Sequence, residues 1–146
     1  MHNERSHSIN QLNSFLRGEI SAVESYRQAL DRVKTASVRT ALEECARSHD
    51  ERVRSLSETV TRLGGTPSRG SGAWGVLAQS VEAGALLFGE KEAVGALEEG
   101  ENHGLRDYVS DLEKLDLESR DFVSYEVLPK QKETQASIAK LKRELS

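Results

Sequence analysis

The feature that most constrains this chain is the helical spacing of its apolar residues, which recurs in four long stretches. The stretches cover about residues 8–34, 37–63, 90–115 and 117–144. A period near 3.6 residues is typical of amphipathic helices that bury one face, and β-branched runs are rare in this chain. The sequence therefore predicts four helices, each of about 25 residues and roughly 38 Å long.

Cap and breaker residues suggest where these helices begin and end. Ser8 with Gln11 three residues later has the spacing of a capping box, and Asp116 is suited to cap the fourth helix. Gly64-Gly65 is expected to end the second helix, because glycine tolerates a left-handed conformation. Pro129 lies inside the fourth stretch and is expected to kink it, since proline lacks an N–H group.

The lengths of the connections limit how the helices pack. A short turn joins the first two, which makes them antiparallel neighbours. Residues 64–89 join the second and third and are numerous enough to return along the bundle, with a short extra helix predicted over 74–88. The predicted fold is an all-α antiparallel four-helix bundle with one long crossover, forming a single domain over residues 1–146.

Each apolar stripe is interrupted near its middle by polar residues. These are Glu19, His49, Glu101 and Gln131, with Gln135 one turn after Gln131. The midpoints of antiparallel helices share one level, so these side chains are expected to meet in one layer. A lone ionised carboxylate there would cost several kcal/mol, so it must be protonated, hydrogen-bonded or bound to a cation.

A nine-residue signature occurs twice, as "GEISAVESY" at 18–26 and as "GENHGLRDY" at 100–108. Both copies read Gly-Glu, six residues, Tyr. The glutamate of each copy is expected to point to the shared centre. Tyr26 and Tyr108 lie two turns further along the same faces, where their hydroxyls can bond across the bundle and support the layer.

Two interpretations of the layer stay open at this point. Carboxylates and imidazole from facing helices form iron and manganese sites in bundle cores, which predicts metal ligands at Glu19, His49 and Glu101. Glu98 is either a fourth ligand or a solvated residue. Alternatively, the same residues form a hydrogen-bonded polar layer without metal that fixes the register of the bundle.

Composition argues against several other classes of function. The net charge is -4, and basic residues are mixed with acidic ones, which disfavours a nucleic-acid partner. The single cysteine, Cys45, excludes intramolecular disulfides and cysteine zinc sites. No signal-peptide core and no run of about 18 apolar residues occurs, so no membrane association and a cytoplasmic location are expected. No phosphate loop or nucleophile motif is present, and no catalytic residue is assigned.

Several segments resemble known proteins. The first helix is similar, at the same spacings, to that of bacterioferritin-like and rubrerythrin-like proteins, and the matching residues are Leu12, Asn13, Leu16, Glu19, Ala22 and Tyr26. "LGGTP" at 63–67 resembles the end of the second helix in that superfamily. With "LNSFLRGE" and "ALEEGENHGLRDY", the chain looks closest to a bacterial ferritin-like four-helix-bundle family known only as a domain of unknown function.

The resemblance implies a metal centre, but the ligand set is incomplete. A ferritin-like di-iron site uses one Glu from each of two helices and Glu-x-x-His from each of the other two. Glu19 and Glu101 match the single glutamates, and His49 matches one histidine. Ala46 replaces the glutamate before His49, and the fourth helix has no histidine. The expectation is a degenerate site for iron or manganese, with zinc as a further candidate.

The resemblance then implies a role in iron handling or oxidative stress. Ferroxidase or peroxidase activity is the enzymatic form of this role, although the missing ligands argue against an enzyme. The alternative is a metal-free helical-bundle interaction or structural stress protein that keeps a polar core layer and no cofactor. The apolar stretch 74–88 exceeds what a crossover needs and predicts either packing on the bundle or a homodimer face.

Overall fold

The computed structural model describes residues 2–72 and 89–146, and this part of the chain is helical with no strand. The elements are α1 (His2–Arg32), α2 (Ala36–Arg62), α4 (Glu90–Asp111), η1 (Leu112–Lys114), α5 (Leu117–Phe122), η2 (Val123–Val127) and α6 (Leu128–Glu144). The prediction of an all-α bundle is confirmed. The predicted helix at 74–88 lies outside the described residues.

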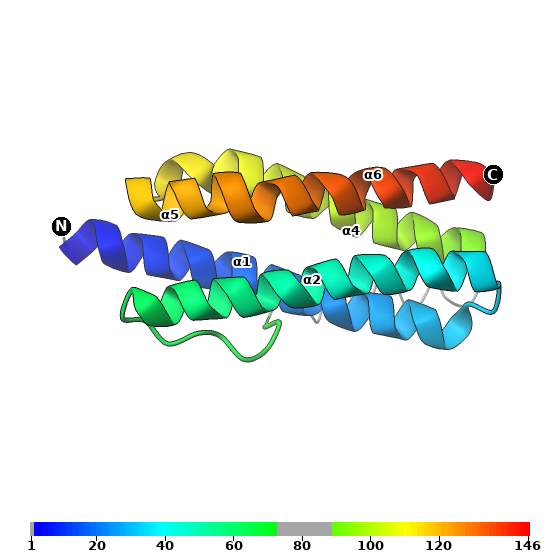
Figure 1. Ribbon diagram of the computed structural model, residues 1–146, viewed down its shortest axis with the longest axis horizontal. Coiled ribbons are helices and arrows are strands. Elements are labelled where there is room, and N and C mark those ends of the chain that lie inside the picture. Colours follow the sequence, from blue (N-terminus) through cyan, green and yellow to red (C-terminus); the bar gives the residue numbers. More distant parts are fainter. Residues whose placement is uncertain (1, 73–88) are drawn as a thin grey trace.

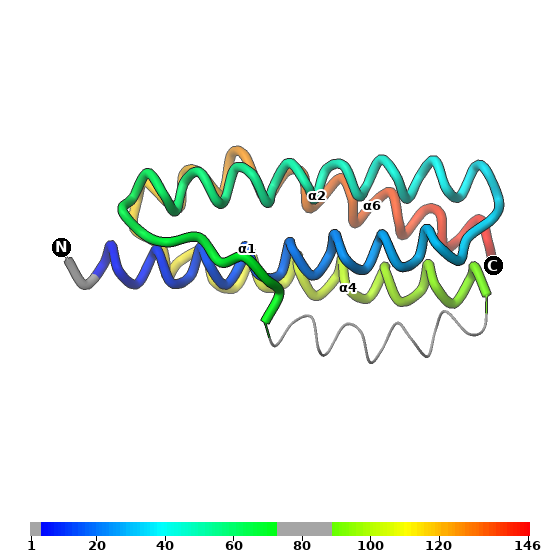
Figure 2. Tube along the Cα trace, turned by 90° about the horizontal axis from the view of Figure 1, so that it is seen from below, coloured from blue at the N-terminus to red at the C-terminus, as the bar shows by residue number. Residues whose placement is uncertain are grey.

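The four long helical rods lie side by side with neighbours running in opposite directions (Figure 1). α1 packs most extensively on α2 and α4 on α6, while α1 also contacts α4 and α2 also contacts α6. The chain leaves α2 at one end of the bundle and re-enters at α4 at the other end (Figure 2). A crossover therefore separates two helical hairpins, as the connection lengths predicted.

The apolar core consists of two clusters. One contains Leu12, Phe15, Leu16, Leu56, Val60, Leu63, Tyr108, Leu115, Val123 and Val127. The other contains Tyr26, Ala29, Val33, Val38, Leu42, Cys45, Val94, Leu97, Ile138 and Leu141. Along each long helix, the stretch between the two clusters carries buried polar residues, among them Glu19, His49, Arg52, Glu101, Gln131 and Thr134. The apolar clusters thus enclose the centre of the bundle from both ends.

The ends of the crossover are attached to the first hairpin. Asn13 accepts a hydrogen bond from the backbone N–H of Ser68 at 2.9 Å. At the other end the Glu90 carboxylate accepts bonds from the backbone N–H groups of Lys34 and Thr35 at 3.0 and 2.9 Å. Gly64 has a φ of 93°, the left-handed conformation expected after α2.

The predicted start of the first helix is wrong. α1 begins at His2, and Ser8 is fully buried within it. The Ser8 hydroxyl accepts a hydrogen bond from the backbone N–H of Asp116 at 2.8 Å instead of capping its own helix. The predicted cap at Asp116 is present, because its carboxylate accepts from the N–H of Ser119 at 2.9 Å.

The fourth helix contains a π-helical turn directly before Pro129. The turn spans Val123–Val127, and the N–H of Leu128 bonds to the carbonyl of Val123. A π turn holds one extra residue, so it rotates the preceding side chains relative to a regular α-helix. The apolar spacing of Phe122, Tyr125 and Leu128 predicts that Tyr125 lies on the buried stripe of the fourth helix. Its side chain is instead 79% exposed, whereas Val123 and Val127 are buried.

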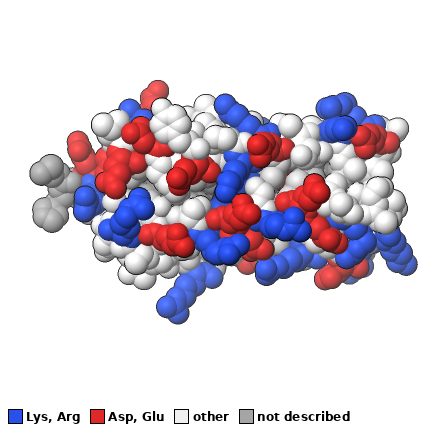
Figure 3. All heavy atoms as spheres, in the orientation of Figure 1, with Lys and Arg blue, Asp and Glu red and all other residues white. Residues whose placement is uncertain are grey.

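On the face of the molecule shown in Figure 3, basic and acidic side chains alternate and neither forms a continuous patch. Among the described residues, no helix is long and apolar enough to cross a membrane.

Candidate functional site

Six polar side chains from all four helical rods meet between the two apolar clusters. We call them the polar layer: Glu19 of α1, His49 and Arg52 of α2, Glu101 of α4, and Gln131 and Thr134 of α6. Each is at most 4% exposed. Burial of so many polar atoms is tolerated only when they are hydrogen-bonded to one another.

His49 lies between the two carboxylates of the layer. Its Nδ1 is 2.5 Å from Oε1 of Glu19, and its Nε2 is 2.7 Å from Oε2 of Glu101. An ionised carboxylate only accepts hydrogen bonds, so each ring nitrogen must carry a proton to bond both. The geometry therefore favours a positively charged imidazolium that joins α1 to α4 through α2.

Arg52 supplies a second buried cation, which sequence reasoning missed. Its Nη1 donates to Oε2 of Glu19 at 3.3 Å and also to the side-chain oxygen of Gln131. Its Nη2 donates to the hydroxyls of Thr134 and Ser48 at 2.9 and 3.2 Å. Arg52 is three residues after His49, so helical spacing on α2 was the available signal.

The repeated signature corresponds to a crossed pair of hydrogen bonds. The Tyr26 hydroxyl on α1 donates to Oε2 of Glu101 on α4, and the Tyr108 hydroxyl on α4 donates to Oε2 of Glu19 on α1, each at 2.5 Å. Since α1 and α4 are antiparallel, each tyrosine reaches back to the glutamate of the opposite copy. Both copies of the signature are therefore needed to complete one layer.

The remaining oxygen of Glu101 is held by α6. Oε1 accepts from Nε2 of Gln131 at 3.0 Å and from the Thr134 hydroxyl at 2.7 Å. Gly104 makes room for this contact, because a Cβ there would lie 3.0 Å from Nε2 of Gln131. With these bonds all four carboxylate oxygens of the layer have protein donors.

Formal charges in the layer cancel. Two carboxylates face one imidazolium and one guanidinium, and no other charged side chain belongs to the layer. Burial raises the pKa of Glu19, but the charges of Arg52 and His49 and the hydrogen bonds from His49 and Tyr108 outweigh it and lower that pKa to about 2. Burial likewise lowers the pKa of His49, but Glu19 and Glu101 outweigh it and hold that pKa above 6.5.

Two further predicted residues stand outside the layer. Glu98 is half-buried and is not a hydrogen-bond or ion-pair partner of Glu19, His49 or Glu101 within the described residues. Gln135 donates to the side-chain oxygen of Asn102 at 2.9 Å, and so bonds α6 to α4 beside the layer. Of the predicted supporting residues, Gln131 and the two tyrosines contact the carboxylates directly.

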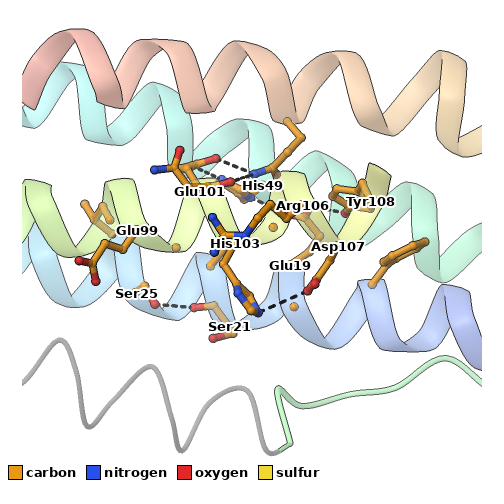
Figure 4. A pocket seen from close by; sticks show the side chains of 18 of the residues that line it. Glu19, Ser21, Ser25, His49, Glu99, Glu101, His103, Arg106, Asp107 and Tyr108 are labelled. Carbon is orange, nitrogen blue, oxygen red and sulfur yellow. Dashed lines mark hydrogen bonds and ion pairs between the residues drawn. The ribbon is translucent and has the colours of Figure 1, made fainter. Parts of the chain in front are cut away.

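A pocket between α1 and α4 leads to the layer. Its cavity measures about 490 Å³, and Glu19, His49 and Glu101 contribute to its lining. Figure 4 shows Ser21 of α1 and Asp107 of α4 along the same pocket. Nε2 of His103 lies 3.5 Å from Oδ2 of Asp107 at the exposed side of this pocket.

The side chains of the layer do not fit the di-metal site that the resemblance implies. Ala46 offers no ligand, and α6 provides Gln131 and Thr134, whose side chains are already bonded to Glu101. Arg52 places a permanent positive charge beside Glu19. Within residues 2–72 and 89–146, no group of three or more His, Cys, Asp or Glu is arranged to hold a metal ion.

Comparison with known sequences places the chain in a family. The family described as "Domain of unknown function (DUF2383)" matches residues 7–114, which include α1, α2 and α4. The chain belongs to this family. No curated protein and no solved structure is significantly similar to it.

Proposed function

We propose that this member of the DUF2383 family is a metal-independent, ferritin-like helical bundle that acts as a structural or interaction protein and not as a ferroxidase or peroxidase. In this proposal the polar layer replaces a metal centre with an internal network of side-chain charges. The network fixes which helix faces meet and at what register.

The observation that carries this proposal is the complete pairing of the two carboxylates. Both oxygens of Glu19 and both of Glu101 already accept bonds from protein groups, and two side-chain cations balance their charge. A metal ion would have to displace protein donors from these oxygens. Iron and manganese prefer carboxylate and imidazole ligands, and this layer has none with its donor atoms free.

The second candidate function is a single divalent metal ion held by Glu19, His49 and Glu101. What favours it is that each carboxylate lies within hydrogen-bond distance of one ring nitrogen of His49, and that all three residues line the pocket between α1 and α4. Such a site would preserve the role in iron handling or oxidative stress that the resemblance implies. It would have to form against the charge of Arg52.

Thermal unfolding with and without metal separates the two functions. Protein treated with a chelator and then dialysed is unfolded alone and with an excess of Fe(II), Mn(II) or Zn(II). A metal that binds only the folded state stabilises it by about 2.7 kcal/mol at a concentration of 100 Kd. We expect no change in Tm, and the variant His49→Ala is expected to respond to metal no differently from the wild type.

The controls are matched by residue type. His103→Ala removes an imidazole from the pocket lining and leaves the layer intact. A metal-induced rise in Tm that survives in His103→Ala and is lost in His49→Ala would overturn the proposal and support the metal site. The predicted homodimer depends on residues 74–88, outside the described part, and light scattering of the full chain tests it.

A further inference from the structure

We infer that the pocket between α1 and α4 is a binding site for a small neutral aliphatic alcohol, whose hydroxyl group bonds to Ser21 and Ser25 and whose hydrocarbon chain lies among small and aromatic side chains. Such a site goes beyond the proposed function, because it gives the bundle a ligand that is unrelated to metal. It also leaves the polar layer as it is, since the side chains of the layer that line the pocket are already hydrogen-bonded to protein groups.

The size of the pocket is suited to a small molecule. Its volume of about 490 Å³ lies within the range of about 300–1,000 Å³ that is typical of ligand sites. Small residues on both helices keep the space open: Gly18 and Ala22 on α1, and Ala96 and Gly100 on α4. A Cβ atom added at Gly18 or Gly100 would meet no heavy atom of the described residues within 4 Å. A ligand that fills this space gains the dispersion contacts that its walls lack.

Ser21 lies on the wall of this pocket and is only 5% exposed, yet its hydroxyl makes no hydrogen bond within the described part of the chain. A buried hydroxyl without a partner costs free energy, which a ligand that bonds to it would recover. The hydroxyl of Ser25, one turn later, donates to the backbone carbonyl of Ser21 at 2.8 Å and keeps its lone pairs as acceptors. Figure 4 shows both serines on α1 beside the pocket.

These two serines favour a hydroxyl group on the ligand. Ser21 can donate a hydrogen bond, and Ser25, whose proton is already engaged, can accept one. An alcohol both donates and accepts, so one ligand oxygen can bond to both side chains. An ether or a ketone only accepts, and would leave the acceptor on Ser25 unused.

The charges around the pocket favour a neutral ligand. Those of the polar layer cancel one another. Asp107 and Asp111 each have a basic side chain close by, at 3.5 and 2.8 Å. The two remaining charged residues of the described lining, Glu99 and Arg106, are exposed and have opposite signs. A charged ligand would therefore lose its hydration without gaining an unpaired partner of opposite charge.

The rest of the wall is suited to a hydrocarbon chain. Phe15 and Tyr108 line the pocket with ring centroids 4.6 Å apart, and Leu97 adds an aliphatic surface. Each methylene group that is buried here should strengthen binding by about fourfold, until the space is filled. Affinity is thus expected to rise with chain length in a series of linear alcohols.

The test is an NMR titration of the isotope-labelled full chain near neutral pH, with 1-hexanol, 1-pentanol, hexylammonium or hexanoate as the probe. We expect 1-hexanol to bind with a Kd of about 1 mM or tighter. It should bind about fourfold more tightly than 1-pentanol and at least about tenfold more tightly than either ion. Equal affinity for the alcohol and the ions, or no saturable shift with 1-hexanol up to about 10 mM, would overturn the inference.

The variant Ser21→Ala tests the hydroxyl contact. It should weaken binding of 1-hexanol by about fivefold, the effect of one hydrogen bond, and leave Tm nearly unchanged because the hydroxyl has no partner among the described residues. Ser57→Ala, at a half-buried position of α2 outside the pocket lining, is the matched control and should bind like the wild type. If Ser21→Ala binds 1-hexanol as tightly as the wild type, Ser21 does not hold the ligand and the inference fails.

The variant Gly18→Leu tests the location. Leucine is a better helix former than glycine, and its Cβ has room, so the fold should persist while the side chain fills the pocket. We expect at least about a tenfold loss of affinity for 1-hexanol. Ala36→Leu adds the same side chain at an exposed position of α2 and should have no effect. Undiminished binding to Gly18→Leu would place the alcohol elsewhere and overturn the inference, whereas the proposed function is tested separately by the response of Tm to metal.

Discussion

The hydroxyl of Tyr26 on α1 lies 2.5 Å from Oε2 of Glu101 on α4, and Tyr108 and Glu19 make the same contact with the helices exchanged. Either tyrosine changed to phenylalanine leaves a buried carboxylate oxygen with one donor fewer. We expect Tyr26→Phe and Tyr108→Phe each to lower the free energy of unfolding by about 1–3 kcal/mol in urea denaturation.

Tyr125→Phe is the matched control, because its side chain is 79% exposed. Its effect should stay within about 0.5 kcal/mol. Equal effects of all three substitutions would show that the crossed bonds contribute nothing specific.

The charge balance of the layer predicts a large effect of Glu19→Gln. The amide keeps the shape of the carboxylate, but leaves two buried cations facing one anion. Removal of one partner of a buried ion pair costs about 3–5 kcal/mol, and we expect a loss of stability in this range. Glu44→Gln on the exposed face of α2 is the control. A Glu19→Gln variant as stable as the wild type would mean that Glu19 is not charged in the folded protein.

The pKa shifts predict an optimum of stability with pH. The pKa of Glu19 falls from 4.5 to about 2 on folding, so its contribution is complete above 4.5 and is lost as the pH falls toward 2. The pKa of His49 is raised above 6.5, so its contribution is complete below 6.5 and is lost as the pH rises through the folded value. The stability of the wild type relative to His49→Gln should therefore decline at alkaline pH, as measured by urea unfolding at several pH values.

We expect that replacing Ser119 with alanine stabilises the folded protein. Its side chain is fully buried, and its hydroxyl has no hydrogen-bond partner in the described structure. An unpaired buried hydroxyl costs about 1–3 kcal/mol, so Ser119→Ala should raise the free energy of unfolding by part of that amount. Ser8→Ala provides the contrast, because the Ser8 hydroxyl accepts a bond from Asp116 and its loss should destabilise the protein.

Helical periodicity was sufficient to predict the bundle and to place four of the six side chains of the polar layer at its centre, namely Glu19, His49, Glu101 and Gln131. Glu19, His49 and Glu101 each stand near the midpoint of a long helix, and midpoints of antiparallel helices coincide. Arg52 was missed because arginine is rarely fully buried and because the apolar spacing of α2 continues from His49 to Val53. Its role depends on partners contributed by α1 and α6, which no local pattern shows.

The fourth helix shows a different limit of the sequence. A regular α-helical period placed Tyr125 on the buried stripe, but the π turn before Pro129 adds one residue and rotates it outward. The missing N–H of Pro129 indicated that the regular α-helix is interrupted near this residue. It did not indicate how, because a kink, a break and a π turn can each accommodate a residue that lacks an N–H group. Packing of Val123 and Val127 in the apolar core accompanies the π turn.

The crossed tyrosine–glutamate contacts also constrain how the two halves of the chain can change. Because α1 and α4 are antiparallel, an axial slip of one past the other alters both contacts by the same amount, and a slip of one turn, about 5.4 Å, would sever both together. Neither helix can therefore shift along its axis to restore one contact without disturbing the other. The two copies of the signature are therefore geometrically coupled, and an insertion in either helix between its glutamate and its tyrosine would need a matching insertion in the other.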